Sequence, residues 1–134
     1  MKGILYTDGG SRGNPGKAGT GSILFDEHMF LLDFTGFAYP RLTNNQAEYN
    51  ALLAGLEIAL KNKITELTCY LDSELIVKQI NGIYKVKDEK IKAIFPQLKL
   101  LIDGFVKIRF IHIPRENNKF ADKLVNIILD AYGK

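Results

Sequence analysis

The segment LYTDGGSRGNPG, residues 5–16, decides how the rest of the chain is interpreted, because it places an aspartate between an apolar run and a glycine-rich stretch. Gly3–Asp8 has the character of a short strand that ends at Asp8. Gly9–Gly16 is rich in residues that favour turns, so we expect it to reverse the chain. Asp8 is therefore either the start of an ordinary turn or a carboxylate placed at a strand end for chemistry.

Outward from this segment, two more strands are expected at Gly19–Asp26 and Met29–Tyr39, separated by the turn-forming pair Glu27-His28. Strands so close together in sequence favour an antiparallel meander. The next segment has a helical pattern, and Thr43 and Gln46 have the spacing of a capping box. The spacing therefore predicts a helix from Thr43 to about Asn62.

The second half of the chain alternates between strand and helix patterns. Glu66–Asp72 alternates as a strand, and a short helix is expected over Ser73–Ile80. Ile91–Ile102 contains Pro96 and is expected to be a helix that is kinked or begins late. Val106–Ile113 is a further strand, and Asn118 is expected to cap a last helix. This order predicts an α/β fold with a five-stranded mixed sheet, antiparallel in its first three strands and parallel in the remainder, flanked by helices.

The composition fits one soluble domain over residues 1–134. The chain is 46% hydrophobic and 25% charged. Its net charge of +3 neither indicates nor excludes a polyanionic partner. Cys69 is the only cysteine, so neither an internal disulfide nor a cysteine-based zinc site can form. No apolar run reaches the ~20 residues of a membrane span, and the N-terminus lacks the apolar core of a signal peptide. We expect a cytoplasmic protein without membrane contact.

Four carboxylates stand at the ends of expected elements. Asp8 and Asp72 end two strands, and such strand ends share one sheet edge if the strands are parallel neighbours. Glu48 and Asp122 lie near the starts of two helices, beside their apolar stripes. Each has an ordinary explanation as a turn residue, a cap or a partner of the helix dipole. If they converge, however, their repulsion raises their pKa values unless cations neutralise them, and divalent ions with oxygen ligands do so.

With these residues in view, the chain resembles the ribonuclease H type 1 family over nearly its whole length. YTDGGSRGNPGKAG resembles the first strand and glycine turn of the family, and TNNQAEYNALLAGLEIAL resembles its acidic helix start. YLDSELIVKQING resembles its second acidic strand end, and IPRENNKFADKLVN resembles its last helix. No single motif is decisive, but the four in order, each with an acid, are specific.

The resemblance implies an endonuclease that cuts the RNA strand of an RNA–DNA hybrid with two Mg²⁺ ions and leaves 5′-phosphate and 3′-hydroxyl ends. The four acids of the family fall on Asp8, Glu48, Asp72 and Asp122. Asp8 is expected to bridge both ions, and Glu48 to hold one ion and meet the 2′-hydroxyl of the RNA. The other two acids complete the two coordination shells. Mn²⁺ is the alternative ion, and a monomer is implied.

The resemblance also implies substrate contacts. Asn14, Asn44 and Asn45 correspond to polar residues that meet sugars and bases in the minor groove, where 2′-hydroxyls distinguish a hybrid from DNA. Thr43 corresponds to the residue that holds a DNA-strand phosphate, and it can also cap its helix. The alternative for the three asparagines is turn and cap chemistry alone.

The chain departs from the family pattern in two places. The loop before Asp122 is short and lacks the mobile histidine of many members, so either Arg115 or Glu116 occupies that position. The tryptophan-containing basic protrusion of some members is missing, and Lys85 and Lys87 are expected to supply a reduced version of its phosphate contacts. These departures leave open an alternative in which the same fold also cleaves double-stranded RNA. A hybrid-binding module without catalysis is a separate alternative, and the intact set of four acids argues against it.

Overall fold

In the computed structural model, which describes residues 1–132, the sheet is built around β1 (Lys2–Gly13). It pairs antiparallel with β2 (Gly16–Asp26) and parallel with β5 (Glu66–Leu71). The remaining strands are β6 (Lys107–His112), parallel to β5, and β3 (Leu31–Thr35) and β4 (Ala38–Leu42), both antiparallel to β2. The order β3-β2-β1-β5-β6, with β4 also on β2, confirms the mixed sheet predicted from the sequence.

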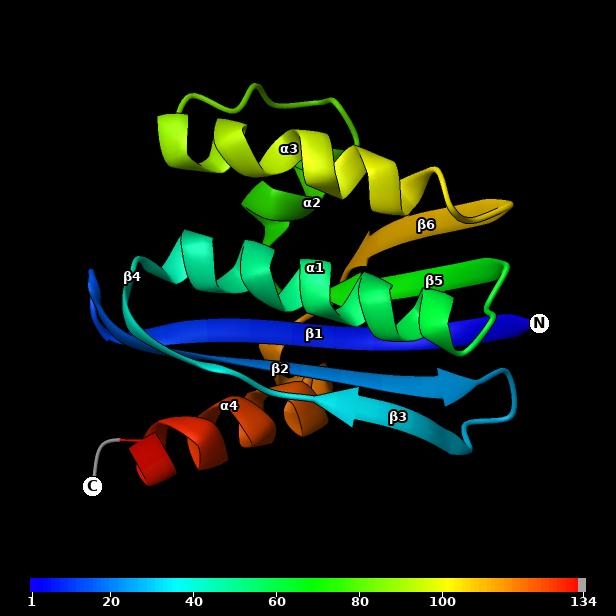
Figure 1. Ribbon diagram of the computed structural model, residues 1–134, viewed down its shortest axis with the longest axis horizontal. Helices are drawn as coiled ribbons and strands as arrows, with labels where there is room; N and C mark the ends of the chain where they lie inside the picture. The colour runs from blue at the N-terminus through cyan, green and yellow to red at the C-terminus, as the bar shows by residue number, and fades with distance from the viewer. Residues whose placement is uncertain (133–134) are drawn as a thin grey trace.

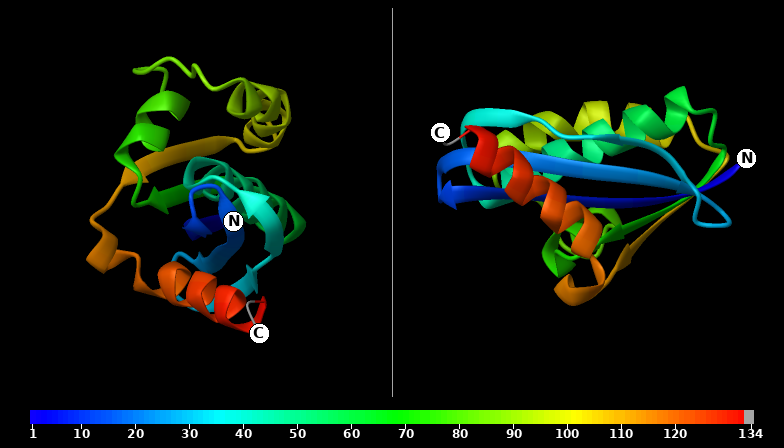
Figure 2. Two further views of the ribbon diagram at one scale, coloured as in Figure 1. Left: turned by 90° about the vertical axis from the view of Figure 1, so that its left-hand side faces the viewer. Right: turned by 90° about the horizontal axis from the view of Figure 1, so that it is seen from below.

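Helices cover both faces of this sheet (Figures 1 and 2). One side carries α1 (Asn44–Lys61), α2 (Glu74–Ile80) and α3 (Glu89–Ile102). The other side carries α4 (Lys119–Tyr132), which follows the single 3-10 turn η1 (Arg115–Asn117). In the described part of the chain, none of these helices has the length and apolar character needed to cross a bilayer.

The core lies between the sheet and α1. Leu5 and Cys69 project from neighbouring strands and are fully buried, as the alternating pattern predicts. Leu52 and Leu56 cover them from the apolar stripe of α1. The helix begins where predicted, because Thr43 accepts from the Gln46 N–H while the Gln46 side chain accepts from the Thr43 N–H.

The expected third strand, Met29–Tyr39, is in fact two strands, so the sheet has six strands rather than five. The break falls at Gly36, where a Cβ atom would lie 2.9 Å from the carbonyl oxygen of Thr20. At this point the Thr20 main-chain N–H donates to the Phe37 carbonyl, and its Oγ1 accepts from the Phe37 N–H. The close approach and these bonds turn the chain without removing it from the edge of β2.

The predicted chain reversal over Gly9–Gly16 is wrong in its extent. Gly9, Gly10 and Gly13 remain in β1, and Gly13 pairs with Gly16 across a turn formed by Asn14 and Pro15 alone. The reason is packing against α1: a Cβ on Gly9 would lie 2.3 Å from the carbonyl of Ala47. Glycine is needed here for close approach between strand and helix, not for a turn.

Two details of the helical half also differ from expectation. The helix around Pro96 does not begin late, because Asp88 accepts from the Lys90 N–H and starts α3 at Glu89. Asn118 stands immediately before α4, as predicted, but its side chain does not cap the helix. It donates instead to the Thr7 carbonyl and to Asp72, across the end of the sheet.

Candidate active site

Asp8 and Asp72 stand at one edge of the sheet because their strands are parallel neighbours. The pairing of β1 with β5 ends at Tyr6 and Tyr70, and each aspartate lies two residues beyond. Two residues is one repeat of the pleat, so both side chains stay on the same face as the preceding tyrosines. The sequence order alone predicted this meeting only on condition that the strands are adjacent, and the structure supplies that condition.

Glu48 reaches the two aspartates because α1 lies close against β1. The missing side chain of Gly9 allows the main chain of Ala47 to approach the strand, and Glu48 follows directly. One carboxylate oxygen from each of Asp8, Glu48 and Asp72 lies within 4.8 Å of the others. Three acids from two strands and one helix therefore form a single cluster.

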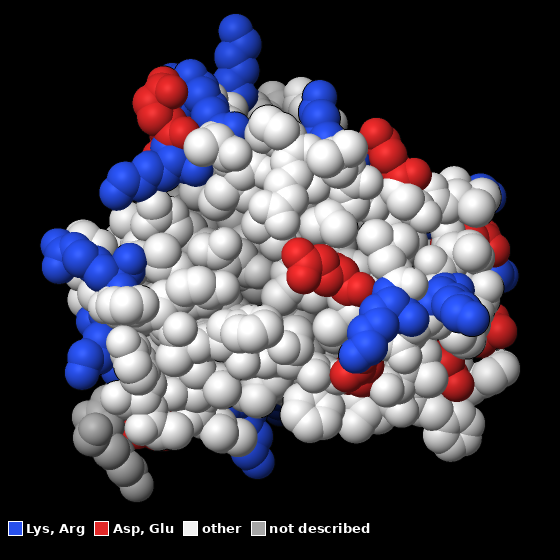
Figure 3. Space-filling view, viewed as in Figure 1, with Lys and Arg blue, Asp and Glu red and all other residues white. Residues whose placement is uncertain are grey.

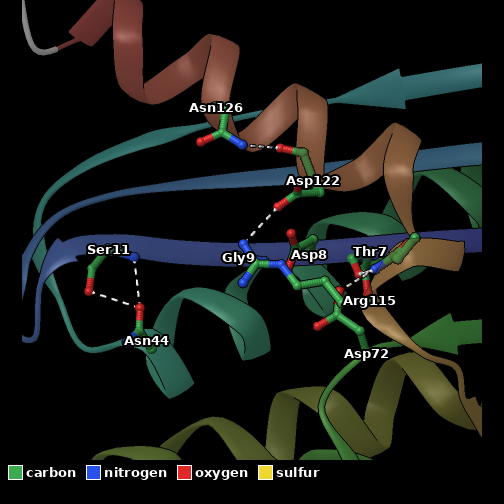
Figure 4. A network of polar contacts seen from close by, with 10 residues as sticks. Thr7, Asp8, Gly9, Ser11, Asn44, Asp72, Arg115, Asp122 and Asn126 are labelled. Atoms are coloured by element: carbon green, nitrogen blue, oxygen red, sulfur yellow. Dashed lines mark hydrogen bonds and ion pairs between the residues drawn. The ribbon is translucent and has the colours of Figure 1, made fainter.

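Asp122 approaches the cluster from the opposite side of the sheet, on the first turn of α4. It lines the same cavity of about 570 Å³ as the other three acids. Figure 4 shows Asp122 on the same side of the site as Asp8, with its carboxylate bonded to the guanidinium of Arg115. All four predicted acids are thus brought to one place by the fold.

Burial and mutual repulsion disfavour the ionised form of the carboxyls in the cluster. Burial, together with the charges of Asp72 and Asp122, raises the pKa of Asp8 from 3.8 to about 7. Burial, with the charges of Asp8 and Asp72, raises the pKa of Glu48 from 4.5 to about 8. These carboxyls hold protons at a pH where ordinary acids are ionised. A divalent cation would replace those protons, since oxygen-only carboxylate ligands are the set that Mg²⁺ and related hard cations prefer.

Of the two residues expected to replace the loop histidine, the structure places Arg115 at the cavity. Its Nη2 donates to Oδ1 of Asp122 at 3.3 Å, and this carboxylate raises the pKa of the guanidinium. The side chain is 78% exposed, so it can leave Asp122 and reach a phosphate. Glu116, although on the same 3-10 turn, does not line the cavity.

Of the residues expected to contact substrate, Asn44 lines the cavity, and Asn14 is hydrogen-bonded to it. The Asn14 side chain accepts from the main-chain N–H of Asn44 at 3.0 Å, and the Asn44 side chain accepts from the N–H of Ser11 at 2.9 Å. These bonds, visible in part in Figure 4, tie the β1–β2 turn to the start of α1. Asn45 is exposed beside them, and Thr43 is half-buried as the helix cap.

Lys85 and Lys87 lie apart from the carboxylates, in the segment between α2 and α3. Both are exposed and line a shallow pocket with Tyr84. Figure 3 shows Lys and Arg side chains gathered over the start of α3 and the adjoining loop. The structure therefore leaves these two cations on a neighbouring surface and not in the cavity.

Asn118 was missed as a site residue by sequence reasoning, which assigned it to helix capping. It is fully buried, and its Nδ2 lies 2.9 Å from both the Thr7 carbonyl and Oδ2 of Asp72. The only available signal was its position four residues before Asp122, and that spacing fits a cap equally well.

The fold and the site together define a ribonuclease H-like α/β domain whose acidic cluster lies at the sheet edge. The model of the reverse transcriptase-like family matches residues 6–127. The bifunctional protein Rv2228c of Mycobacterium tuberculosis is 41% identical over 98% of this chain, which spans 36% of that protein. Ribonuclease HI of Halobacterium salinarum is 38% identical over 93% of this chain, which matches 63% of it.

Solved structures agree with these relatives. The N-terminal RNase H domain of the mycobacterial protein has a TM-score of 0.95 at 39% identity, with 98% of this chain and 95% of that chain covered. LC11-RNase H1, solved in complex with an RNA/DNA hybrid, has a TM-score of 0.92 at 41% identity, with 98% and 99% covered. The chain therefore belongs to the ribonuclease H type 1 family.

Proposed function

We propose that this protein is an endonuclease that hydrolyses the RNA strand of RNA–DNA hybrids and leaves 5′-phosphate and 3′-hydroxyl ends. The observation that carries the proposal is the cluster of Asp8, Glu48 and Asp72, whose ligand oxygens lie within 4.8 Å, with Asp122 beside it. The solved complex of LC11-RNase H1 with a hybrid, at 41% identity over almost the whole chain, supports the substrate class.

We further propose that the four carboxylates hold two Mg²⁺ ions when substrate is bound, with Mn²⁺ as a substitute. The ions would supply an activated water and stabilise the leaving oxygen of the phosphodiester. Asp8 belongs to the cluster with Glu48 and Asp72 and also interacts with Asp122, so it is the acid that would contact both ions. The raised pKa values of Asp8 and Glu48 mean that these carboxyls must release protons as the ions bind.

The residues around the cavity would position the hybrid. Asn14, Asn44 and Asn45 are exposed, and Asn44 lines the cavity of the carboxylates, so these short polar side chains could contact 2′-hydroxyls in a shallow minor groove. Thr43 stands at the start of α1, where the positive end of the helix dipole favours a phosphate. Arg115 is exposed enough to contact a phosphate near the site of cleavage. Because one chain supplies all four acids, we propose that the active unit is a monomer.

The test is a cleavage assay with a hybrid labelled on its RNA strand, beside duplex DNA and duplex RNA, in Mg²⁺. We expect cuts in the RNA of the hybrid alone, abolished by EDTA and by Asp8→Asn. Asp103→Asn is the matched control, since this aspartate is exposed at the end of α3 and should leave cleavage unchanged. Binding of the hybrid without any cut would favour a binding module, and cuts in duplex RNA would extend the substrate class.

The contribution of Lys85 and Lys87 is tested by salt dependence. If both contact phosphates, their joint replacement by Ala should lower the slope of log affinity against log salt by about 2. Replacement of Lys61 and Lys63, at the far end of α1, is the control and should leave the slope unchanged. An unchanged slope in the Lys85 and Lys87 variant would remove this surface from the hybrid interface.

A further inference from the structure

Asn118 links β1 and β5 just beyond the point where their pairing stops, beside Asp8 and Asp72. The hydrogen-bonded ladder between β1 and β5 stops at Tyr6 and Tyr70, so no main-chain pairing joins the strands where the aspartates stand. Beyond that point, the Asn118 amide donates to the carbonyl of Thr7, the residue before Asp8. It also donates to Oδ2 of Asp72, and each distance is 2.9 Å.

The orientation of this amide is determined by its neighbours. A main-chain carbonyl accepts only, and an ionised carboxylate accepts only, so both demand the NH₂ group of Asn118. Its Oδ1 is consequently turned away and has no hydrogen-bond partner in the described part of the chain. An unpaired buried carbonyl is unfavourable. Its cost is offset because both amide donors are used, one on the Thr7 carbonyl and one on Asp72.

The same residue is connected to the fourth acid. The main-chain carbonyl of Asn118 accepts from the N–H of Asp122 at 3.1 Å, the first helical bond of α4. Asn118 therefore contacts β1, β5 and α4 at the points where each presents a carboxylate. With Oδ2 of Asp72 engaged by the amide, Oδ1 is the oxygen that keeps its full capacity for a cation.

From this arrangement we propose that Asn118 is a positioning residue for the acidic cluster. It holds the Asp72 carboxylate in one rotamer and sets the separation between β1 at Thr7 and the segment that follows β5, and so sets the cation affinity of the site. This inference rests on the proposed metal-dependent function. It concerns how the site is held together and not which nucleic acid is cut.

The test compares Asn118→Ala with Asn62→Ala, a matched control from outside the site. The Asn62 amide likewise donates to one carboxylate, Asp33, and to one main-chain carbonyl, that of Ile58. Mn²⁺ binding is measured by titration calorimetry on the whole protein without nucleic acid, and turnover on the hybrid is measured separately. Mutation of a residue that hydrogen-bonds to a metal-binding side chain typically lowers the metal affinity ~10-fold or more.

We expect Asn118→Ala to weaken Mn²⁺ binding by that factor and to lower kcat while KM for the hybrid stays near that of the wild type. Asn62→Ala should change neither quantity, even if its melting temperature falls. Asn118→Leu keeps the side-chain volume without its donors, and it should reproduce the loss if the alanine variant does not fold.

Mn²⁺ affinity within twofold of wild type in a folded Asn118 variant would overturn the positioning role, and so would a wild-type protein that binds no Mn²⁺. Because calorimetry uses no nucleic acid, loss of Mn²⁺ binding in Asn118→Ala supports the role even if the wild type cuts no hybrid. In that case the proposed substrate fails and the positioning residue stands.

Discussion

Replacing Asp8 with Asn should stabilise the metal-free protein at alkaline pH while it abolishes hydrolysis. The folded protein holds the Asp8 proton up to a pKa of about 7, against 3.8 for an ordinary aspartate. Above pH 7, ionisation of this one buried group therefore costs about 4 kcal/mol of folding free energy at most, at about 1.4 kcal/mol per pH unit. Asn has nearly the same shape, carries no charge, and can still accept from the Gly9 N–H through its oxygen.

The pH dependence follows from the direction of the shift. Between pH 4 and pH 8 the folded state binds more protons than the unfolded chain, so the stability of the metal-free wild type falls as the pH rises. At pH 4 the carboxyl is neutral in the folded state and only partly ionised in the unfolded chain, so it costs little. The advantage of Asp8→Asn should thus be near zero at pH 4 and reach ~2 kcal/mol at pH 8, after allowance for coupling to Glu48.

Thermal unfolding in EDTA across this pH range measures the effect. A gain of ~2 kcal/mol corresponds to a rise in Tm of roughly 5–10 °C for a domain of this size. Addition of Mg²⁺ should raise the Tm of the wild type and leave that of the variant almost unchanged. An Asp8→Asn protein no more stable than wild type at pH 8, or equally favoured at pH 4 and pH 8, would refute the reasoning.

Three further changes test how the site is built. Gly9→Ala should lower stability by ~3 kcal/mol or more, because its methyl group would overlap the α1 main chain, whereas Gly10→Ala, with only ordinary contact nearby, should cost far less in thermal unfolding. Thr43→Ala removes the capping box of α1 and should cost ~1 kcal/mol in denaturant unfolding, with weaker hybrid binding in a filter assay. Arg115→Ala should lower the turnover rate while Glu116→Ala leaves it unchanged, since only the arginine lines the cavity; equal rates in the two variants would exclude this role.

Much of the fold could be predicted from local sequence pattern, and the predictions that failed have a common cause. The capping box at Thr43 and Gln46 placed the start of α1 correctly, because a cap depends only on residues three apart. The strand break at Gly36 and the straight course of β1 through Gly9 were not predicted. Both depend on how closely another segment approaches, and composition within the segment cannot show that.

The sequence by itself determined which acids are present, near which strands and helices they stand, and the family to which their order belongs. Only the tertiary structure decided that Asp8, Glu48 and Asp72 meet within 4.8 Å, because their meeting depends on β1 and β5 lying side by side with α1 against them. It also decided that Arg115 lines the cavity and Glu116 does not, since the direction of a side chain on a 3-10 turn is set by what surrounds it. Asn118 shows the same limit: a residue placed like a helix cap became the link between β1 and the segment after β5, because a buried amide pairs with the acceptors that the packing brings to it.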